Sequence, residues 1–142
     1  MCTASLGRAV RLWDIRCLPT SYKHHQHSII KEPECENCLH EYTHPLSVNS
    51  AFFNQTGDML VTTCQDNYLR VFNTVSSGQE EHVVKITHRN QTGKWLTKLM
   101  AEWYISPNKE DHSKSDAVQY FHCGSMDEPR QVNVCVSHQF LL

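Results

Sequence analysis

The segment Val10–Arg16, with the sequence Val-Arg-Leu-Trp-Asp-Ile-Arg, limits the possible folds of this chain more than any other feature. It has a short strand pattern that runs into Trp-Asp, the dipeptide that marks the third strand of a propeller blade. The segment Tyr68–Asn73 has the same layout, with Phe-Asn in place of Trp-Asp. A single blade cannot bury its apolar face alone, so two such strands predict several blades packed side by side.

The length of the chain sets the number of blades. A blade takes about 40–45 residues and a closed propeller has about 4–8 blades, so this chain holds roughly three. We therefore predict an all-β fold: a WD-repeat β-propeller fragment of about three blades, each a four-stranded antiparallel unit. The predicted units are an incomplete blade with an inserted connection (1–43), a near-complete blade (44–88) and a partial blade (89–142). The best-defined strands are expected at Val10–Ile15, Val48–Phe53, Met59–Cys64, Leu69–Asn73 and Leu99–Trp103.

Composition excludes several classes of protein. Hydrophobic residues make up 39% of the chain and charged residues 20%, which argues against a largely disordered protein. No apolar run approaches the roughly 18 residues of a membrane span, and the N-terminus does not resemble a signal peptide. Seven cysteines without a secretion signal indicate reduced intracellular thiols. The net charge of −2 means that nucleic-acid binding would need a local basic patch.

One set of polar residues is expected to support the second blade. WD-repeat blades commonly contain a hydrogen-bonded set of a buried His, a Ser or Thr, a turn Asp and a Trp. His44, Thr62 and Asp66 match three members of that set, and Phe72 replaces the Trp and removes its donor. We therefore predict a structural role for His44, Thr62 and Asp66, not a catalytic one.

A metal site is the weaker interpretation of a nearby cluster. Cys35, Cys38 and His40, with His44, have the C-x2-C and H-x3-H spacing of zinc ligands. A classical zinc finger, however, needs about a dozen residues between the two pairs, and here only Leu39 separates them. The sequence also lacks a nucleophile elbow, a glycine-rich phosphate loop and paired carboxylates with metal spacing. We predict no enzyme, cofactor or small-molecule substrate, and keep a zinc-binding module as a third alternative.

The segment that follows the second blade suggests a function. It places the cations Arg89, Lys94 and Lys98 around Trp95, at the crossing from an outer strand to the next inner strand. Cations can contact phosphates, and an exposed aromatic ring can stack on a base or wedge between bases. The alternative is that Trp95 is a core residue, and for Trp103, on the inner strand, we predict the core. Arg89, Lys94, Trp95 and Lys98 are the predicted DNA-binding residues.

The run Thr92–Trp103 resembles the Thr-Gly-basic-Trp-Leu-Thr signature, ending in Ala-x-Trp, of the family that joins WD repeat-containing protein 76 with damage-specific DNA-binding protein 2. The resemblance implies a seven-bladed nuclear propeller that binds DNA and acts in the DNA damage response. It also implies that Gly93-Lys94-Trp95 occupies the place of an aromatic wedge presented to distorted duplex. The chain departs from the family pattern at two positions, where Gly7 and Asn73 each replace an Asp.

A second function class comes from the first blade. Trp13, Asp14 and Arg16 form a Trp-Asp-x-Arg sequence that resembles the motif by which many propellers dock onto the adaptor of cullin-4 ubiquitin ligases. The Arg would offer a bidentate charged anchor. The predicted partners are therefore DNA, including damaged or modified duplex, and alternatively this adaptor, with the protein acting as a scaffold or substrate receptor.

Overall fold

The computed structural model describes residues 1–17, 38–75, 84–90, 92, 97–104, 119–126 and, for the backbone, 132–136. Within these ranges the regular structure is ten β-strands and one short 3-10 helix, η1 (Ile15–Cys17), which confirms the predicted all-β class. None of the helices in the described part of the chain has the length and apolar character needed to cross a bilayer.

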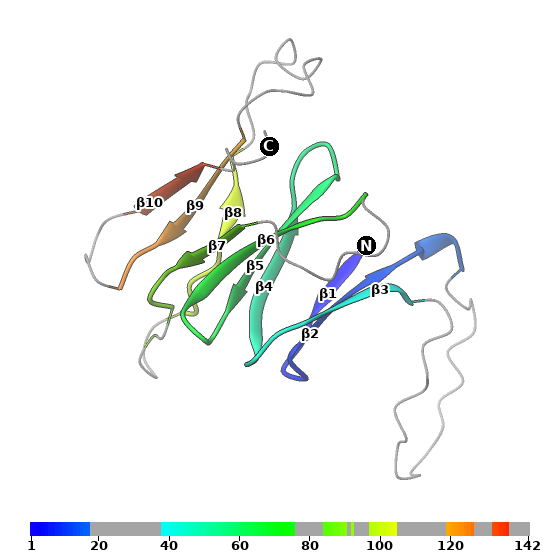
Figure 1. The fold of residues 1–142 in the computed structure, drawn as a ribbon, viewed down its shortest axis with the longest axis horizontal. Coiled ribbons are helices and arrows are strands. Elements are labelled where there is room, and N and C mark those ends of the chain that lie inside the picture. The colour runs from blue at the N-terminus through cyan, green and yellow to red at the C-terminus, as the bar shows by residue number, and fades with distance from the viewer. Residues whose placement is uncertain are drawn as a thin grey trace.

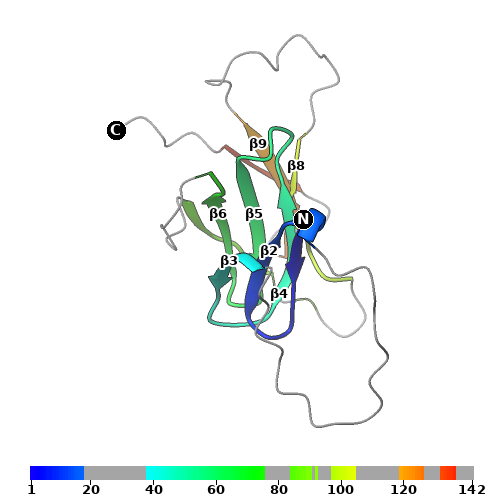
Figure 2. The same ribbon diagram turned by 90° about the vertical axis from the view of Figure 1, so that its right-hand side faces the viewer.

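The strands form three antiparallel sheets that lie side by side (Figures 1 and 2). The middle sheet has four strands in sequence order, as a complete blade requires, and each flanking sheet has three. The first sheet comprises β1 (Cys2–Ala4), β2 (Ala9–Trp13) and β3 (Cys38–Thr43); the middle sheet β4 (Val48–Phe53), β5 (Met59–Cys64), β6 (Tyr68–Asn73) and β7 (Val84–Thr87); the third sheet β8 (Glu102–Trp103), β9 (Tyr120–Gly124) and β10 (Val132–Val136). Each sheet lies within one of the three predicted units.

Two strands are shorter than their sequence patterns predict. β2 ends at Trp13, and Ile15 belongs to η1, because the Arg16 amide donates to Asp14 Oδ1 (3.0 Å) and turns the backbone. β8 covers only Glu102–Trp103. The Ala101 amide donates instead to the Thr63 hydroxyl oxygen (2.9 Å), so this part of the segment is tied to the middle sheet by a side chain.

The middle sheet is buried on both faces, which explains the nearly continuous apolar character of β5 and β6. One face packs against the first sheet and the other against the third, and each buried Val, Leu or Phe contributes about 1.5–3 kcal/mol. The core against the first sheet consists of Val10, Leu12, Tyr42, Val48, Leu60 and Phe72. The core against the third sheet consists of Val61, Leu69, Val71, Ala101, Trp103, Phe121 and Cys123.

Trp103 is one of these core residues, as predicted. Its side chain is only 7% exposed and contacts Phe121 edge to face, with ring centroids 5.2 Å apart. The indole N–H donates to the Phe52 carbonyl oxygen on β4 (2.9 Å), so the ring is buried without leaving its polar atom unpaired.

The same backbone connection occurs in the first and middle sheets. Arg8 and Asn67 each precede the strand after a tight turn, and both have a left-handed backbone, with φ of 65° and 64°. The carbonyl oxygen of Arg8 accepts from the amide of His44 (2.8 Å), and that of Asn67 accepts from the amide of His88 (2.9 Å). His44 and His88 each follow directly after an outer strand. The repeat shows that these sheets are successive units of a partial β-propeller.

Candidate nucleic-acid-binding rim

Turns and crossings of successive sheets meet along one edge of the molecule. We call this edge the turn rim and define it by the β1–β2 turn (6–8), the β3–β4 connection (44–47), the β5–β6 turn (65–67) and the described residues of the β7–β8 connection (88–90, 92 and 97–100). The Ser47 hydroxyl donates to the Leu6 carbonyl oxygen (3.1 Å), and the Gln65 amide donates to the Ser47 carbonyl oxygen (2.9 Å). These bonds join the first two sheets along the rim, which is the lower edge in Figure 1.

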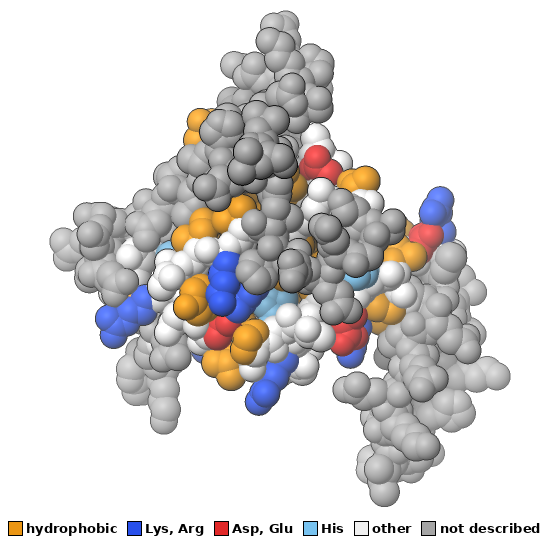
Figure 3. All heavy atoms as spheres, in the orientation of Figure 1, with side chains coloured by type: hydrophobic (Ala, Val, Ile, Leu, Met, Phe, Trp, Pro, Cys, Tyr) orange, Lys and Arg blue, Asp and Glu red, His pale blue; other side chains and the backbone are white. Residues whose placement is uncertain are grey.

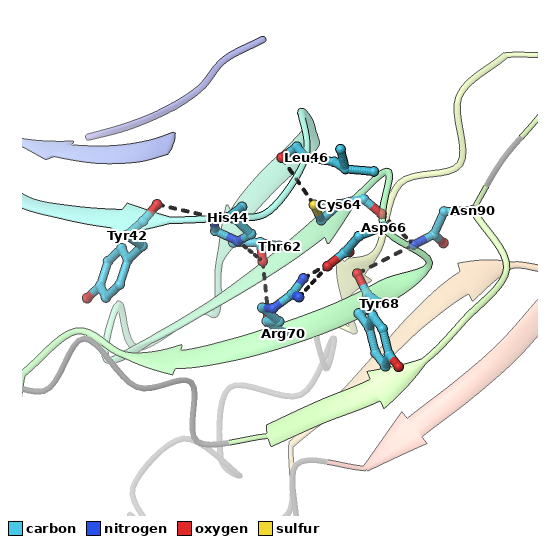
Figure 4. Close-up of polar contacts among 9 residues, drawn as sticks. All are labelled: Tyr42, His44, Leu46, Thr62, Cys64, Asp66, Tyr68, Arg70 and Asn90. Atoms are coloured by element: carbon cyan, nitrogen blue, oxygen red, sulfur yellow. Dashed lines mark hydrogen bonds and ion pairs between the residues drawn. The ribbon is translucent and has the colours of Figure 1, made fainter. Parts of the chain in front are cut away.

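Asn90 anchors the start of the β7–β8 connection. Its side chain is 1% exposed, and its Nδ2 donates to the Cys64 carbonyl oxygen (3.0 Å) while its backbone amide donates to Asn67 Oδ1 (3.0 Å). Its Oδ1 lies 2.5 Å from Nδ1 of the buried His88. These contacts fix the root of the segment that carries the predicted DNA-binding residues to the β5–β6 turn (Figure 4). No residue pattern in the sequence indicated this role.

The charges on the described part of the turn rim are mostly positive. Arg8, Arg89 and Lys98 are exposed there. The described acidic residue of the rim is Asp66, whose carboxylate is largely buried and paired with Arg70. The other described carboxylates, Asp14, Glu41, Asp58 and Glu102, lie outside the residues that define the turn rim. Figure 3 shows blue lysine and arginine groups at the lower part of this face, with red carboxylate groups beside some of them.

The structure describes part of the predicted DNA-binding set. Arg89 and Lys98 lie in the β7–β8 connection, and both are exposed. Leu99, near the end of that connection, lies close to Gly124, the last residue of β9: a Cβ added at Gly124 would meet Leu99 Cδ2 at 2.9 Å. Lys94 and Trp95 lie outside the described residues.

His44 and Asp66 of the predicted blade set belong to the turn rim, and Thr62 lies beside them on β5 (Figure 4). Nδ1 of His44 faces the Tyr42 carbonyl oxygen (3.1 Å), which can only accept, so Nδ1 carries a proton. Nε2 of His44 lies 3.0 Å from the Thr62 hydroxyl oxygen, and the same hydroxyl lies 3.4 Å from the Arg70 carbonyl oxygen, to which it can donate. Phe72 packs edge-on against His44, with centroids 5.6 Å apart, and so fills the Trp position with apolar contact.

Asp66, the third member of the predicted set, has a partner that the sequence analysis missed. Arg70 donates from Nη1 to Asp66 Oδ1 (3.0 Å) and from Nη2 to Oδ2, and its side chain is only 5% exposed. Burial acts to raise the pKa of the Asp66 carboxyl, but hydrogen bonds from Arg70 and Cys64 and the charge of Arg70 outweigh it and hold that pKa below its usual value. The i,i+4 spacing of Asp66 and Arg70 across a tight turn was the available signal.

The first sheet shows the consequence of replacing the turn Asp. Gly7 precedes the left-handed residue Arg8 as Asp66 precedes Asn67, and Arg11 opposes Thr3 as Arg70 opposes Thr62. Without a turn carboxylate, Arg11 donates from Nε to Glu41 Oε2 on the neighbouring strand (2.5 Å), in a more exposed ion pair. The first sheet therefore keeps an ion-paired Arg at this position with a different partner.

The Trp-Asp-x-Arg motif lies at the other end of the first sheet. β2 begins beside the turn rim and leads away from it, so Trp13, Asp14 and Arg16 lie at the opposite rim. Trp13 Nε1 donates to the Thr3 hydroxyl oxygen (2.9 Å). Arg16 is 86% exposed and donates from Nε and Nη2 to the two oxygens of Asp14, at 3.0 and 2.8 Å. Those hydrogen bonds lower the pKa of Asp14 to about 2.

The candidate zinc ligands are only partly described. Cys35 lies outside the described residues, and the Cys38 thiol donates to the His40 carbonyl oxygen (3.3 Å). His40 packs edge-on against Tyr42, while His44 has Tyr42 and Thr62 as partners. Within the described ranges no three His, Cys, Asp or Glu residues gather so that they could hold a metal ion. The zinc alternative gains no support from these contacts.

Comparison with known proteins identifies relatives of this chain, although no protein-family model matches it. WD repeat-containing protein 76 of Mus musculus is 43% identical over 93 residues, which cover 64% of this chain and 13% of that protein. DNA damage-binding protein CMR1 of Coccidioides immitis is 33% identical over 121 residues, covering 76% of this chain and 20% of the relative. Protein DAMAGED DNA-BINDING 2 of Arabidopsis thaliana is 32% identical over 94 residues, which cover 66% of this chain and 14% of that protein.

The chain thus spans between 13% and 20% of the length of these three relatives. By sequence similarity and by fold, the chain belongs to the WD-repeat family of WD repeat-containing protein 76 and the DNA damage-binding proteins.

Proposed function

We propose that the protein carrying this chain binds DNA through the turn rim and acts in the DNA damage response in the nucleus. It would act as a binding protein and not as an enzyme. The observation that carries the proposal is the rim itself. Three exposed cations, Arg8, Arg89 and Lys98, lie along it in the described residues, and its described carboxylate, Asp66, is already neutralised by a buried ion pair.

The chemistry of DNA explains why such a rim suits a duplex. Arg and Lys contact phosphate oxygens and so position a protein on DNA without reading its sequence. Trp95, in the same connection as Arg89 and Lys98, would supply the base contact, because an aromatic ring can stack on a base or wedge into a distorted step. The names of two relatives, DNA damage-binding protein CMR1 and DAMAGED DNA-BINDING 2, support DNA as the ligand.

The test measures affinity of the full-length protein for regular and distorted duplexes as a function of salt. Lys94→Ala should weaken both duplexes alike and flatten the salt dependence by about one phosphate contact. Trp95→Ala should cost about 1–3 kcal/mol, with a reduced preference for the distorted duplex. Arg16→Ala is the matched control, since Arg16 is 86% exposed at the rim opposite the turn rim.

Two results would count against the proposal. If Lys94→Ala and Arg16→Ala behave alike, the β7–β8 connection does not contact phosphates. If Trp95→Ala only lowers thermal stability and leaves the preference for distorted duplex unchanged, Trp95 is a core residue.

A second candidate function is docking onto the adaptor of a cullin-4 ubiquitin ligase. One observation favours it: Arg16 is 86% exposed and held beside Asp14 at the rim opposite the proposed DNA contact, so both partners could bind at once. Arg16→Ala in the full-length protein should abolish co-purification with the adaptor and leave DNA binding intact. Arg16→Lys should also weaken it, because an amine lacks the bidentate geometry of a guanidinium. Unchanged co-purification in both variants would exclude this anchor.

A further inference from the structure

We propose that Arg8, in the β1–β2 turn, is a further phosphate contact, so that the DNA-binding surface extends along the turn rim from the third unit to the first sheet. This inference rests on the proposed DNA binding. The observation behind it is that Arg8 is an exposed cation in an unfavourable backbone conformation. The corresponding residue of the next sheet, Asn67, is neutral.

The position of Arg8 is defined by the repeat. Arg8 and Asn67 occupy the same place in successive sheets: each follows a tight turn, has φ near 65°, and offers its carbonyl oxygen to the amide of the His after the outer strand. In the middle sheet the residue is Asn67, and Asn tolerates the left-handed region. In the first sheet it is Arg8, and Arg adopts that region less readily.

The backbone alone therefore gives no reason for Arg at position 8. Asn or Gly would adopt the same φ more easily and would still offer the carbonyl oxygen that His44 uses. The Arg8 side chain also adds little to the packing, since the residue is exposed and takes no part in the ion pairs among the described residues. Strained residues of this kind often occur at ligand-binding sites.

The turn is held on the rim that carries the other cations. The Ser47 hydroxyl donates to the Leu6 carbonyl oxygen, and the His44 amide donates to the Arg8 carbonyl oxygen, so the turn is fixed to the β3–β4 connection. The Gln65 amide extends this chain of bonds through Ser47 to the β5–β6 turn. Arg8 and Arg89 are thereby presented on one continuous rim, as a backbone contact that follows a duplex requires.

The test compares Arg8→Asn with wild type in the full-length protein. We expect DNA affinity to fall for regular and distorted duplexes alike, and the salt slope to lose about one phosphate contact. Raising the salt concentration from 50 to 200 mM should therefore weaken DNA binding by a factor about threefold smaller in Arg8→Asn than in wild type. The thermal midpoint should stay the same or rise, because Asn suits the left-handed turn. Arg8→Lys should retain the salt slope, and Arg16→Asn, at the opposite rim, should match wild type.

The outcomes separate this inference from the proposed function. If Lys94→Ala weakens binding while Arg8→Asn leaves affinity and salt slope unchanged, the inference fails and the proposed function stands. If Arg8→Asn lowers the thermal midpoint together with affinity, without altering the salt slope, Arg8 has a structural role and the inference is overturned. If wild type binds neither duplex, both ideas fail.

Discussion

Replacing Asp66 with Asn should destabilise the protein strongly although the change is nearly isosteric. The Asn amide offers one acceptor oxygen to Arg70 but turns a donor toward its second nitrogen, and it leaves the guanidinium without a counter-charge. Arg70 is 5% exposed at the side chain and cannot turn to water without opening the interface between the first two sheets. Breaking a buried pair by removing one partner costs about 3–5 kcal/mol. Because Asp66 is 12% exposed, we expect about 3 kcal/mol.

The assay is urea unfolding of the full-length protein as a function of pH. The pKa of Asp66 is lower in the folded protein than in the unfolded chain, where a carboxyl has a pKa of about 4. The ion pair therefore contributes fully above about pH 4 and is lost as pH falls through the folded pKa. The difference in unfolding free energy between wild type and Asp66→Asn should be about 3 kcal/mol at pH 7 and should narrow below about pH 4.

Glu41→Gln is the matched control. Glu41 pairs with Arg11, the residue of the first sheet that corresponds to Arg70, but its side chain is 41% exposed. An exposed pair of this kind contributes about 0–1 kcal/mol. A cost below about 1 kcal/mol for Asp66→Asn, or a cost that does not change between pH 7 and pH 3, would refute the reasoning.

Two further predictions concern the contacts beneath the turn rim. Thr62→Val should lower the unfolding free energy by about 1–3 kcal/mol, because it leaves Nε2 of the buried His44 without its hydroxyl partner; an unchanged urea midpoint would contradict this. Asn90→Ala should speed amide exchange in 88–92 and reduce the preference for distorted duplex, because it frees the root of the connection that carries Trp95. Asn54→Ala, at another buried Asn outside the turn rim, should alter stability without altering that preference.

Most of the fold could be predicted from short-range patterns. The β-rich composition of Val48–Phe53 and the Trp-Asp and Phe-Asn strand ends predicted strands that the structure confirms. The two strand boundaries that were predicted wrongly lie where a side chain takes the place of a backbone hydrogen bond of the sheet. Asp14 turns the backbone before Ile15, and Thr63 takes the amide of Ala101, and neither event changes the polarity pattern from which strands are predicted.

The site was less predictable because its members come from different sheets. His44 and Thr62 could be named from the blade pattern, and they lie within hydrogen-bond distance. To predict the ion pair of Arg70, one must know that this position is buried. To predict the contacts of Asn90, one must know which turn lies beside it. The significance of Arg8 appears only when its backbone angle is compared with that of Asn67.

Amide hydrogen exchange of the full-length protein, with and without a distorted duplex, tests the central claim most directly. The account predicts slower exchange on DNA binding in the turn-rim segments 6–8, 44–47 and 88–100. It predicts no change in the β4–β5 turn at 54–58 or around Asp14 and Arg16, which lie at the other rim. Protection confined to that other rim, or tight DNA binding without protection of 88–100, would contradict the proposal that the turn rim is the DNA-binding surface.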